Sequence, residues 1–260
     1  MGKMEWLLKD SRLDNIPVGS KEWFNTQREI ILSRPLLKHY YDSWYKAMLA
    51  DEATVPEEQK GIILEIGAGG SYIKQLRYDI VTSDVIPDVA DIVVDATKIP
   101  FPNNSVRAIF LTHTFHHIPD VEKFLSEAER VLVPGGVVSI VDASSTPFAR
   151  FFFKYFHPEP HEPKAKTWTF DWNHNMNDSN QALSWIVFKR DRKRFEKTFP
   201  NLRIEKIKYS PWLGYMASGG VTRKSLVPKF AIPIVKGIDY LSKPVQPLGT
   251  LVWHITLRKV

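Results

Sequence analysis

The sequence predicts an α/β fold in which a doubly wound sheet of about seven strands is covered by helices. Short apolar runs alternate with helical patterns from residue 61 onward, an order typical of a parallel sheet. The first of these runs ends in a glycine turn, and acidic residues end or follow the next two. The length of 260 residues favours one enlarged domain over two small ones.

The first 60 residues are expected to form a helical N-terminal cap. Apolar and aromatic side chains recur at helical spacing over residues 21–50, around Pro35. The polar residues 51–60 then separate this segment from the predicted sheet.

Five strands and one helix are expected next, in a core that spans residues 61–142. The strands are predicted at residues 61–66, 79–83, 90–94, 106–111 and 137–141. The last of them is almost continuously apolar, as buried parallel strands are. A helix over residues 121–133 has its apolar side chains on one face and stops at Pro134-Gly135-Gly136.

One more helix and two closing strands complete the expected domain of residues 1–260. The helix is predicted over residues 180–199, with Asp178 or Ser179 as N-cap and Pro200 as its stop. The strands are predicted at 204–209 and 250–257. Residues 143–178 and 211–249 are left over, and we interpret them as insertions on the substrate side.

Composition excludes several classes of chemistry. The chain has no cysteine, which rules out disulfides, thiolate zinc sites, iron–sulfur clusters and cysteine nucleophiles. Residues 1–10 lack the apolar core of a signal peptide, and Trp6 stands where myristoylation of Gly2 needs Ser or Thr. No apolar run approaches the ~20 residues that span a bilayer. These features favour a cytoplasmic protein.

Charge is distributed unevenly along the chain. Residues 150–260 carry 20 basic and 8 acidic side chains, a net charge of +12, whereas the whole chain carries +6. Such a field suggests an anionic partner, and a well-solvated surface explains it equally well.

The glycine turn at residues 67–70 and two acids downstream indicate a site for an adenosine-containing ligand. The turn lets backbone N–H groups approach a ligand closely. Tyr72 stands where a dinucleotide fingerprint would need its third glycine, which argues against NAD or FAD. Asp84 and Asp95 end the second and third strands, where carboxylates can accept ribose hydroxyls and an adenine amino group. Each acid alone can also simply cap a turn.

Taken together, these segments resemble the class I S-adenosylmethionine-dependent methyltransferases, specifically the type 11 group. The matching segments are Glu65-Ile-Gly-Ala-Gly-Gly, Ser83-Asp84-Val85, Asp95-Ala96-Thr97-Lys98-Ile99-Pro100-Phe101, Thr114-Phe115-His116-His117-Ile118-Pro119-Asp120 and Glu129-Arg130-Val131-Leu132-Val133-Pro134-Gly135-Gly136. The resemblance covers residues 61–142 and implies a Rossmann-like sheet with S-adenosylmethionine as cofactor. Two departures are Ser71, where many relatives have a third glycine, and the long connection between the last two strands.

The resemblance also implies roles for particular residues. The glycine turn and its acid would contact the methionine end of the cofactor, Asp84 the ribose, and Val85 the adenine ring. Asp95 and Ala96 resemble the adenine amino site, and Thr112 and His113 look like residues beneath the sulfonium. The predicted cofactor residues are therefore Glu65, Gly67, Ala68, Gly69, Asp84, Val85, Asp95, Ala96, Thr112 and His113.

Three side chains are candidates for proton transfer, which is needed only if the acceptor is a hydroxyl or an acidic C–H. His116 and His117 follow the fourth strand, and histidine is the natural base near neutral pH. Asp142, a carboxylate that ends the fifth strand, is the third candidate for proton transfer. A structural role for the two histidines and a capping role for Asp142 remain open alternatives.

No metal site is expected. His157, His161 and His174 lie in the first insertion, where His157-Pro-Glu-Pro-His161-Glu162 is an extended, proline-containing segment. Spacing gives these side chains no convergent geometry, so a structural or substrate-facing loop is predicted.

Each insertion contains an amphipathic pattern. Residues 148–156 would place Phe148, Phe151, Phe152, Tyr155 and Phe156 on one helical face, with Arg150 and Lys154 opposite. Residues 233–243 would place Ile234, Val235, Ile238 and Leu241 on one face, with Lys229, Lys236 and Lys243 on the other. The first pattern fits a lid, a substrate wall or a contact with a lipid surface, and the second fits a helix at a lipid surface. Both also fit an ordinary packed helix.

These observations predict a methyltransferase acting on a small-molecule or lipid-linked acceptor, such as a glycan. They allow peripheral contact with an anionic membrane at its inner face. One alternative is an RNA-binding module that uses the basic C-terminal region, but its basic residues follow no recognisable RNA-binding motif. A non-catalytic cofactor-binding protein is another alternative, against which the complete set of Glu65, Asp84 and Asp95 argues. No Asn-Pro-Pro-Tyr or Asp-Pro-Pro-Tyr motif follows the fourth strand, which argues against methylation of base amino groups.

Overall fold

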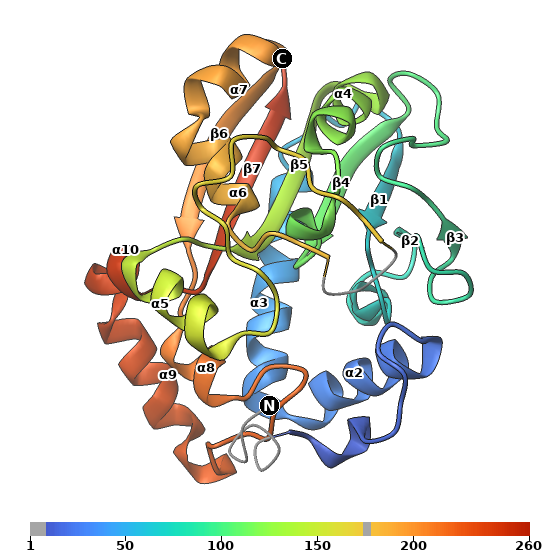
Figure 1. The fold of residues 1–260 in the computed structure, drawn as a ribbon. Helices are drawn as coiled ribbons and strands as arrows, with labels where there is room; N and C mark the ends of the chain where they lie inside the picture. Colours follow the sequence, from blue (N-terminus) through green and yellow to red (C-terminus); the bar gives the residue numbers. More distant parts are fainter. Residues whose placement is uncertain (1–8, 174–177) are drawn as a thin grey trace.

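A computed structural model describes residues 9–173 and 178–260 (Figure 1). Gly2, Trp6 and His174 lie outside the described residues. Seven strands form one sheet in the order β3-β2-β1-β4-β5-β7-β6. The strands are β1 (Ile62–Ile66), β2 (Val81–Asp84), β3 (Ile92–Val93), β4 (Val106–Thr112), β5 (Leu132–Ala143), β6 (Leu202–Tyr209) and β7 (Val252–Lys259). The first five are parallel neighbours, and β7 runs antiparallel between β5 and β6. The expected seven-stranded doubly wound α/β sheet is confirmed.

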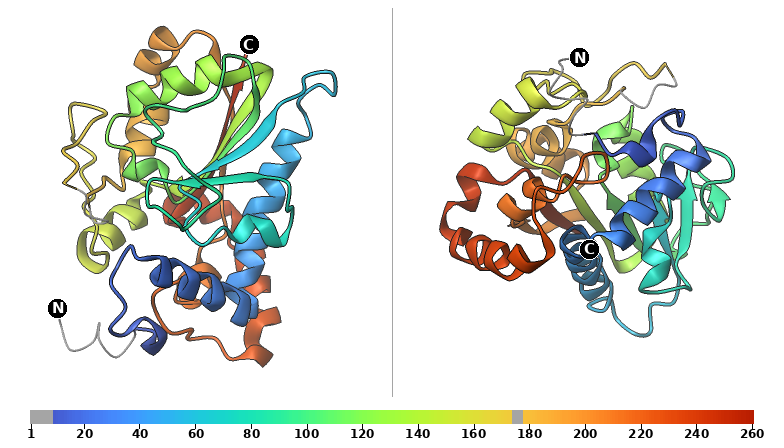
Figure 2. Two further views of the ribbon diagram at one scale, coloured as in Figure 1. Left: turned by 90° about the vertical axis from the view of Figure 1, so that its right-hand side faces the viewer. Right: turned by 90° about the horizontal axis from the view of Figure 1, so that it is seen from below.

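Helices cover both faces of the sheet, and further helices gather beyond the carboxyl ends of the parallel strands. They are α2 (Lys21–Ser33), α3 (Pro35–Glu52), α4 (Val121–Val131), α5 (Pro147–Phe156), α6 (Leu183–Trp185), α7 (Arg192–Thr198), α8 (Leu213–Ala217), α9 (Ile232–Leu241) and α10 (Gln246–Gly249). Shorter turns are η1 (Ser11–Leu13), η2 (Tyr72–Gln75), η3 (Phe115–His117), η4 (Ile186–Arg190, a π-helix), η5 (Lys229–Ala231) and η6 (Lys243–Val245). The N-terminal helices and both insertions lie around the carboxyl ends of the parallel strands (Figures 1 and 2).

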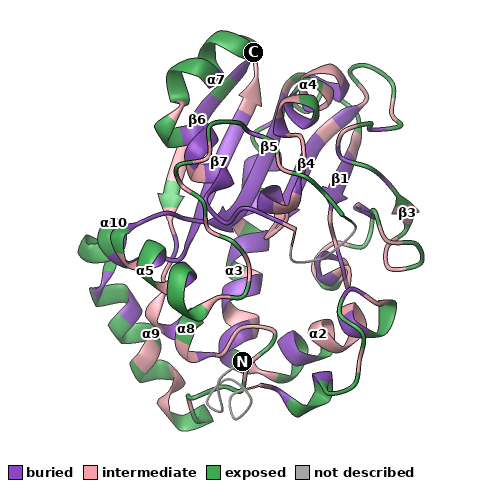
Figure 3. Cartoon of the chain, viewed as in Figure 1, coloured by how far each residue is buried: buried purple, intermediate pink, exposed green. Residues whose placement is uncertain are grey.

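Two apolar cores lie on opposite faces of the sheet. Along β4, Ile109 and Leu111 belong to one core, and Ala108 and Phe110 belong to the other. This alternation follows from the two-residue period of a strand. The first core packs against α4, α6 and α7, and the second packs against α2 and α3. Because both faces are covered, the central strands are buried along almost their whole length (Figure 3).

The N-terminal cap is helical, as expected, and consists of two helices. The Ser20 hydroxyl accepts a hydrogen bond from Trp23 N and so caps α2. Pro35 occupies the first turn of α3, where its missing N–H costs no helical hydrogen bond. The segment therefore divides at Arg34, and α3 packs against β4 and β5 while α2 passes below the strand ends (Figure 1).

The helix predicted over residues 180–199 is broken. It consists of α6, the π-helical turn η4 and α7, and the interruption falls at Asp191, whose carboxylate accepts a hydrogen bond from Trp168 Nε1. The predicted N-caps Asp178 and Ser179 are wrong, because α6 begins at Leu183. The side chain of Asn180 instead accepts a hydrogen bond from Ala182 N. The stop before Pro200 is correct.

The two predicted amphipathic helices exist, but only part of each apolar face is covered: Phe148, Phe152 and Val235 pack half-buried against the core. Helix α5 buries Ala149 and Phe153, while Phe151 and Tyr155 are exposed. Helix α9 buries Asp239, whose carboxylate accepts hydrogen bonds from Tyr40 and Gly214 N, while Ile234 and Leu241 are 63% and 76% exposed. No helix within residues 9–173 and 178–260 is long and apolar enough to cross a membrane.

Candidate functional site

A cavity of about 1750 Å³ opens at the carboxyl ends of β1, β2 and β4. Ligands bind at this edge of open α/β sheets. Its wall is completed by α2, α3, α5 and the segment around Tyr215. All of the predicted cofactor residues except Glu65 line it, as do His116 and His117, whereas Glu65 and Asp142 are fully buried behind the wall.

The glycine turn after β1 needs glycine at two positions. Gly67 and Gly69 have φ angles of +65° and +48°, in the left-handed region that favours glycine. A Cβ on Gly67 would lie 2.2 Å from the Thr114 side chain, and one on Gly69 would lie 2.8 Å from the Phe24 ring. The turn is therefore a cradle whose backbone can approach a ligand without side chains in between.

Glu65 supplies an unsatisfied carboxyl oxygen directly behind this cradle. Its Oε1 accepts a hydrogen bond of 2.7 Å from the Tyr45 hydroxyl, and its Oε2 is buried with no hydrogen-bond partner among the described residues. Burial raises the pKa of Glu65 to about 8, against the opposing effect of the Tyr45 hydrogen bond. A buried polar atom without a partner is rare and indicates a missing hydrogen-bond partner, which a ligand amine would supply to the carboxylate.

Asp84 and Asp95 differ in how firmly they are held. Asp84 is buried, and its two oxygens accept hydrogen bonds from Gly69 N and Ile86 N at 3.0 and 3.1 Å. Burial raises the pKa of Asp84, although these backbone N–H groups oppose the shift. Asp95 is exposed, and its Oδ1 accepts hydrogen bonds from the backbone and the hydroxyl of Thr97, so it caps a turn while also lining the cavity.

His113 stands at the floor of the cavity in an unusual environment. Its φ of +55° is uncommon for a residue other than glycine. The ring stacks on Tyr215 with 6.2 Å between centroids and meets Trp44 edge to face. Burial lowers the pKa of His113 to about 4, so the ring is neutral, and its buried Nε2 has no partner among the described residues.

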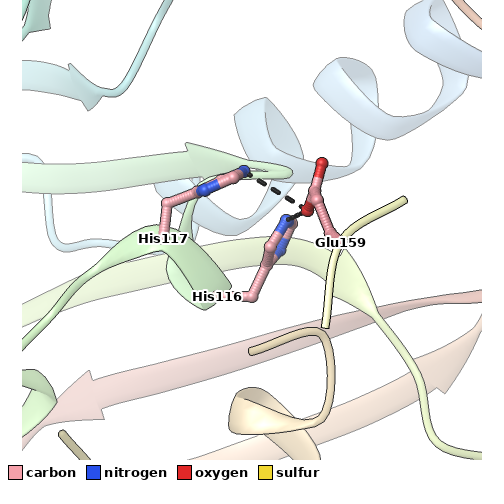
Figure 4. Close-up of side chains that lie close together, drawn as sticks. All are labelled: His116, His117 and Glu159. Atoms are coloured by element: carbon pink, nitrogen blue, oxygen red, sulfur yellow. Dashed lines mark ion pairs between the residues drawn. The ribbon is translucent and has the colours of Figure 1, made fainter. Parts of the chain in front are cut away.

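His116 is enclosed by two carboxylates. Its Nδ1 lies 2.5 Å from Asp142 Oδ1. Its Nε2 lies 3.2 Å from Glu159 Oε2 (Figure 4). Burial lowers the pKa of His116, but the charges and hydrogen bonds of Asp142 and Glu159 outweigh it and raise the pKa to about 10. Burial also raises the pKa of Glu159, yet the hydrogen bond and charge of His116 hold it well below its usual range.

His117 lies beside this pair. Its Nε2 is 3.7 Å from the same oxygen of Glu159 (Figure 4). Burial lowers the pKa of His117 to about 4, helped by the nearby charge of His116. Two of the predicted proton-transfer residues thus meet at one carboxylate, and the third, Asp142, holds His116 from behind.

Glu159 was missed in the sequence because nothing in its local pattern brings it to η3. Backbone hydrogen bonds supply the placement: Asn180 N donates to His116 O, and Gln181 N donates to Pro160 O. The side chain of Gln181 adds contacts to both Glu159 and His116 Nε2. Residues 158–162 are therefore fixed against η3 through residues 180 and 181.

The aromatic lining from α3 was also missed. Tyr41 belongs to the apolar pattern of the predicted cap and Tyr45 lies in the same segment, so the sequence indicates a packed helix rather than a site. In the structure both line the cavity, and Tyr45 stacks on Tyr72 with 5.8 Å between centroids. Burial raises the pKa of both tyrosines well above the usual value, so they remain protonated hydrogen-bond donors.

The family model described as a methyltransferase domain matches residues 64–140, which run from β1 into β5. A ubiquinone/menaquinone biosynthesis C-methyltransferase from Desulfotalea psychrophila is 33% identical over 72 residues, which cover 25% of this chain and 29% of that protein. A demethylmenaquinone methyltransferase from Lysinibacillus sphaericus is 24% identical over 142 residues, 51% of this chain and 56% of that protein. The chain thus matches less than two thirds of the length of these curated relatives.

Similarity to a solved structure extends over nearly the whole chain. A geranyl diphosphate C-methyltransferase from Streptomyces coelicolor, in complex with Mg²⁺, geranyl diphosphate and S-adenosyl-L-homocysteine, has a TM-score of 0.51 at 14% identity. The match covers 97% of this chain and 89% of that one. At this identity the likeness shows a shared fold.

Proposed function

We propose that this chain, which carries a class I methyltransferase domain, transfers the methyl group of S-adenosylmethionine to a large acceptor. The proposed acceptor is partly apolar and linked to a lipid. The observation that carries the proposal is the cavity of about 1750 Å³. Ligand pockets usually measure about 300–1,000 Å³. The space therefore accommodates the cofactor together with a sizeable acceptor.

The residues around the glycine turn fit the cofactor. Glu65 Oε2 would accept a hydrogen bond from the amino group at its methionine end, above the cradle of Gly67, Ala68 and Gly69. Asp84 would bind the ribose hydroxyls, and Asp95 and Ala96 would face the adenine amino group, with Val85 against the ring. The cofactor supplies an electrophilic methyl group, so the protein's task is mainly to align it with the acceptor.

His113 is the side chain that we assign to the reacting group of the acceptor. It follows Thr112 at the end of β4 and is neutral, and within residues 9–173 and 178–260 its Nε2 has no hydrogen-bond partner, so it can bind a group of the acceptor. His116 suits this role less well, because Asp142 and Glu159 occupy both ring nitrogens. His117 remains accessible from the cavity but faces Glu159.

The surface of α5, α9 and α10 supports a lipid-linked acceptor. These helices lie side by side (Figures 1 and 2), and together with the turns η5 and η6 they expose a set of apolar side chains that we call the apolar surface. It consists of Phe151, Tyr155, Phe156, Phe230, Ile234, Ile238, Leu241, Val245 and Leu248. Lys154, Lys229, Lys236 and Lys243 are exposed on the same elements. Apolar side chains flanked by lysines suit the headgroup region of an anionic bilayer, where such an acceptor would reside.

A transfer assay tests the acceptor class. The purified chain is incubated with methyl-labelled S-adenosylmethionine and either the lipid extract or the water-soluble extract of cells. We expect label to enter the lipid fraction, because the cavity and the apolar surface both favour an acceptor with an apolar part. Label that enters only the water-soluble fraction would contradict the lipid-linked acceptor and leave methyl transfer itself intact.

The role of His113 is tested by His113→Asn, since asparagine tolerates the positive φ that this position requires. We expect cofactor affinity to be retained and turnover to fall by ~10²-fold, the usual contribution of a positioned proton-transfer group. Unchanged turnover in this variant would remove His113 from the mechanism.

A further inference from the structure

We propose that His116, His117 and Glu159 form a binding site for one divalent transition-metal ion of the zinc class. Each residue offers one ligand atom, and these atoms all lie within 4.8 Å of one another (Figure 4). Two imidazoles and one carboxylate are a ligand set that Zn²⁺ and its first-row neighbours accept, and no thiolate is required.

The distances are close to those of a coordination shell. Zinc bonds to nitrogen and oxygen are about 2.0–2.2 Å long, so two ligands of a tetrahedral ion lie about 3.4 Å apart. His116 Nε2 and Glu159 Oε2 are separated by 3.2 Å, and His117 Nε2 and the same oxygen by 3.7 Å. Two of the three ligand-to-ligand distances are thus within a few tenths of an ångström of the expected value, and the two ring nitrogens lie within 4.8 Å of each other.

Partners outside the ligand set already orient these side chains. Asp142, itself fully buried, contacts the Nδ1 of His116 and so directs its Nε2 toward Glu159. The ring of His117 bonds to the backbone of Asp178. Histidines that bind metals characteristically use their second nitrogen in this way, to a carboxylate or a backbone carbonyl. The Gln181 amide contacts Glu159 Oε2 and His116 Nε2, the two ligand atoms themselves, so it must move aside when the ion binds.

Charge also matches a doubly charged ion. Two carboxylates, Asp142 and Glu159, surround two imidazoles, and one divalent cation would neutralise the carboxylates in this partly buried region. All three ligands line the cavity, so the remaining coordination positions face it. Three protein ligands with an open position are typical of catalytic rather than structural zinc sites. We expect an oxygen of the acceptor to fill the open position, and this expectation rests on the proposed function.

Metal binding is measured directly on the full chain, after chelation and without cofactor or acceptor. Calorimetric titration with Zn²⁺ is expected to give one ion per chain, and Co²⁺ is expected to give visible d–d absorption bands of a four- or five-coordinate site. Absence of binding, or binding with no defined stoichiometry, would overturn the proposal.

Matched variants assign the ligands. Glu159→Gln is compared with Glu162→Gln, an exposed acid three residues later on the same segment, and His117→Ala is compared with His39→Ala on α3. The first member of each pair should weaken Zn²⁺ binding at least about tenfold, and the second should leave it unchanged. Asp142→Asn should weaken binding about 10–100-fold, as partners of ligating histidines do. Equal affinity in Glu159→Gln and Glu162→Gln would place the ion elsewhere.

A second titration with S-adenosylmethionine, on the same samples, separates this proposal from the proposed function. A chain that binds the cofactor but not Zn²⁺ contradicts only the metal site. A chain that binds Zn²⁺ but not the cofactor contradicts only methyl transfer. Thermal melting of each variant establishes that a loss of binding is not a loss of folding.

Discussion

Asp84 is held so that its carboxylate faces the cavity while backbone N–H groups fix its position. Asp84→Ala removes a charged acceptor for two ribose hydroxyls and should weaken S-adenosylmethionine binding by roughly 2 kcal/mol, or about 30-fold. Calorimetry measures this change. Asp88→Asn, a change in the exposed loop that follows, is the matched control and should bind normally. Undiminished affinity in Asp84→Ala would disprove the ribose assignment.

Glu65 gives the free protein a pH dependence with a definite sign. Its pKa is raised from 4.5 to about 8, chiefly by burial, so the folded chain keeps a proton that the unfolded chain loses above pH 4.5. The contribution of Glu65 to folding stability should therefore decrease as pH rises from about 4.5 to about 8, because the folded state keeps the Glu65 proton that the unfolded state has lost. The denaturant midpoint of Glu65→Gln should accordingly rise across this range relative to that of the unmodified chain. Parallel slopes for the two proteins would contradict this account.

At the scale of helices, the lysines beside the apolar surface should control binding to lipid. Each basic side chain near an anionic membrane contributes about 1 kcal/mol, and salt screens the attraction. The triple change of Lys229, Lys236 and Lys243 to Gln should reduce co-sedimentation with anionic vesicles at low salt. Binding should also be weaker at physiological salt and to neutral vesicles.

A matched control alters the same charge at the other end of the molecule. Lys189, Lys193 and Lys197 lie on η4 and α7, far from α9 in the first figure, and their change to Gln should leave vesicle binding intact. An equal loss in both triple variants would indicate a general charge effect, and absence of vesicle binding by the unmodified chain would favour a soluble acceptor.

The elements of the core could be predicted because each is specified by its own neighbours in sequence. The glycine turn follows β1, and the predicted helix 121–133 ends near Val131, since local pattern and burial agree there. The face that α9 buries was not predictable, because it depends on Asp239 bonding to Tyr40, a residue 199 positions away. Glu159 shows the same limit: its partner His116 lies 43 residues earlier, and no periodic pattern links the two.

For the whole molecule, the basic side chains of residues 150–260 are spread over several elements. Arg192 and Arg194 on α7 pair with Glu196 and Glu122, while Arg203, Lys206 and Lys208 lie on the edge strand β6 and further lysines lie around α9. Nucleic acid is bound by basic patches or stripes, and its binding depends strongly on salt. Salt-dependent binding of RNA by the chain would support the RNA-binding module, and its absence would favour attraction at the apolar surface.

The position of β7 predicts the effect of truncation. A chain ended after Gly249 lacks β7, so β5 loses its antiparallel neighbour and β6 loses all of its sheet hydrogen bonds. Unpaired strand edges promote association between chains. This variant should aggregate, as size-exclusion chromatography would reveal, whereas a chain ended after Lys259 should stay folded. A monomeric, folded product from the shorter chain would contradict the prediction.

The same strand order has a consequence for the time course of folding. During translation β6 emerges more than forty residues before β7, yet it can join the sheet only through β7. The region that includes α8, α9 and α10 must therefore leave the ribosome while the β5 edge is still open, and a chaperone has that interval in which to protect it. The insertion that we associate with acceptor choice thus also sets how long the nascent chain remains vulnerable.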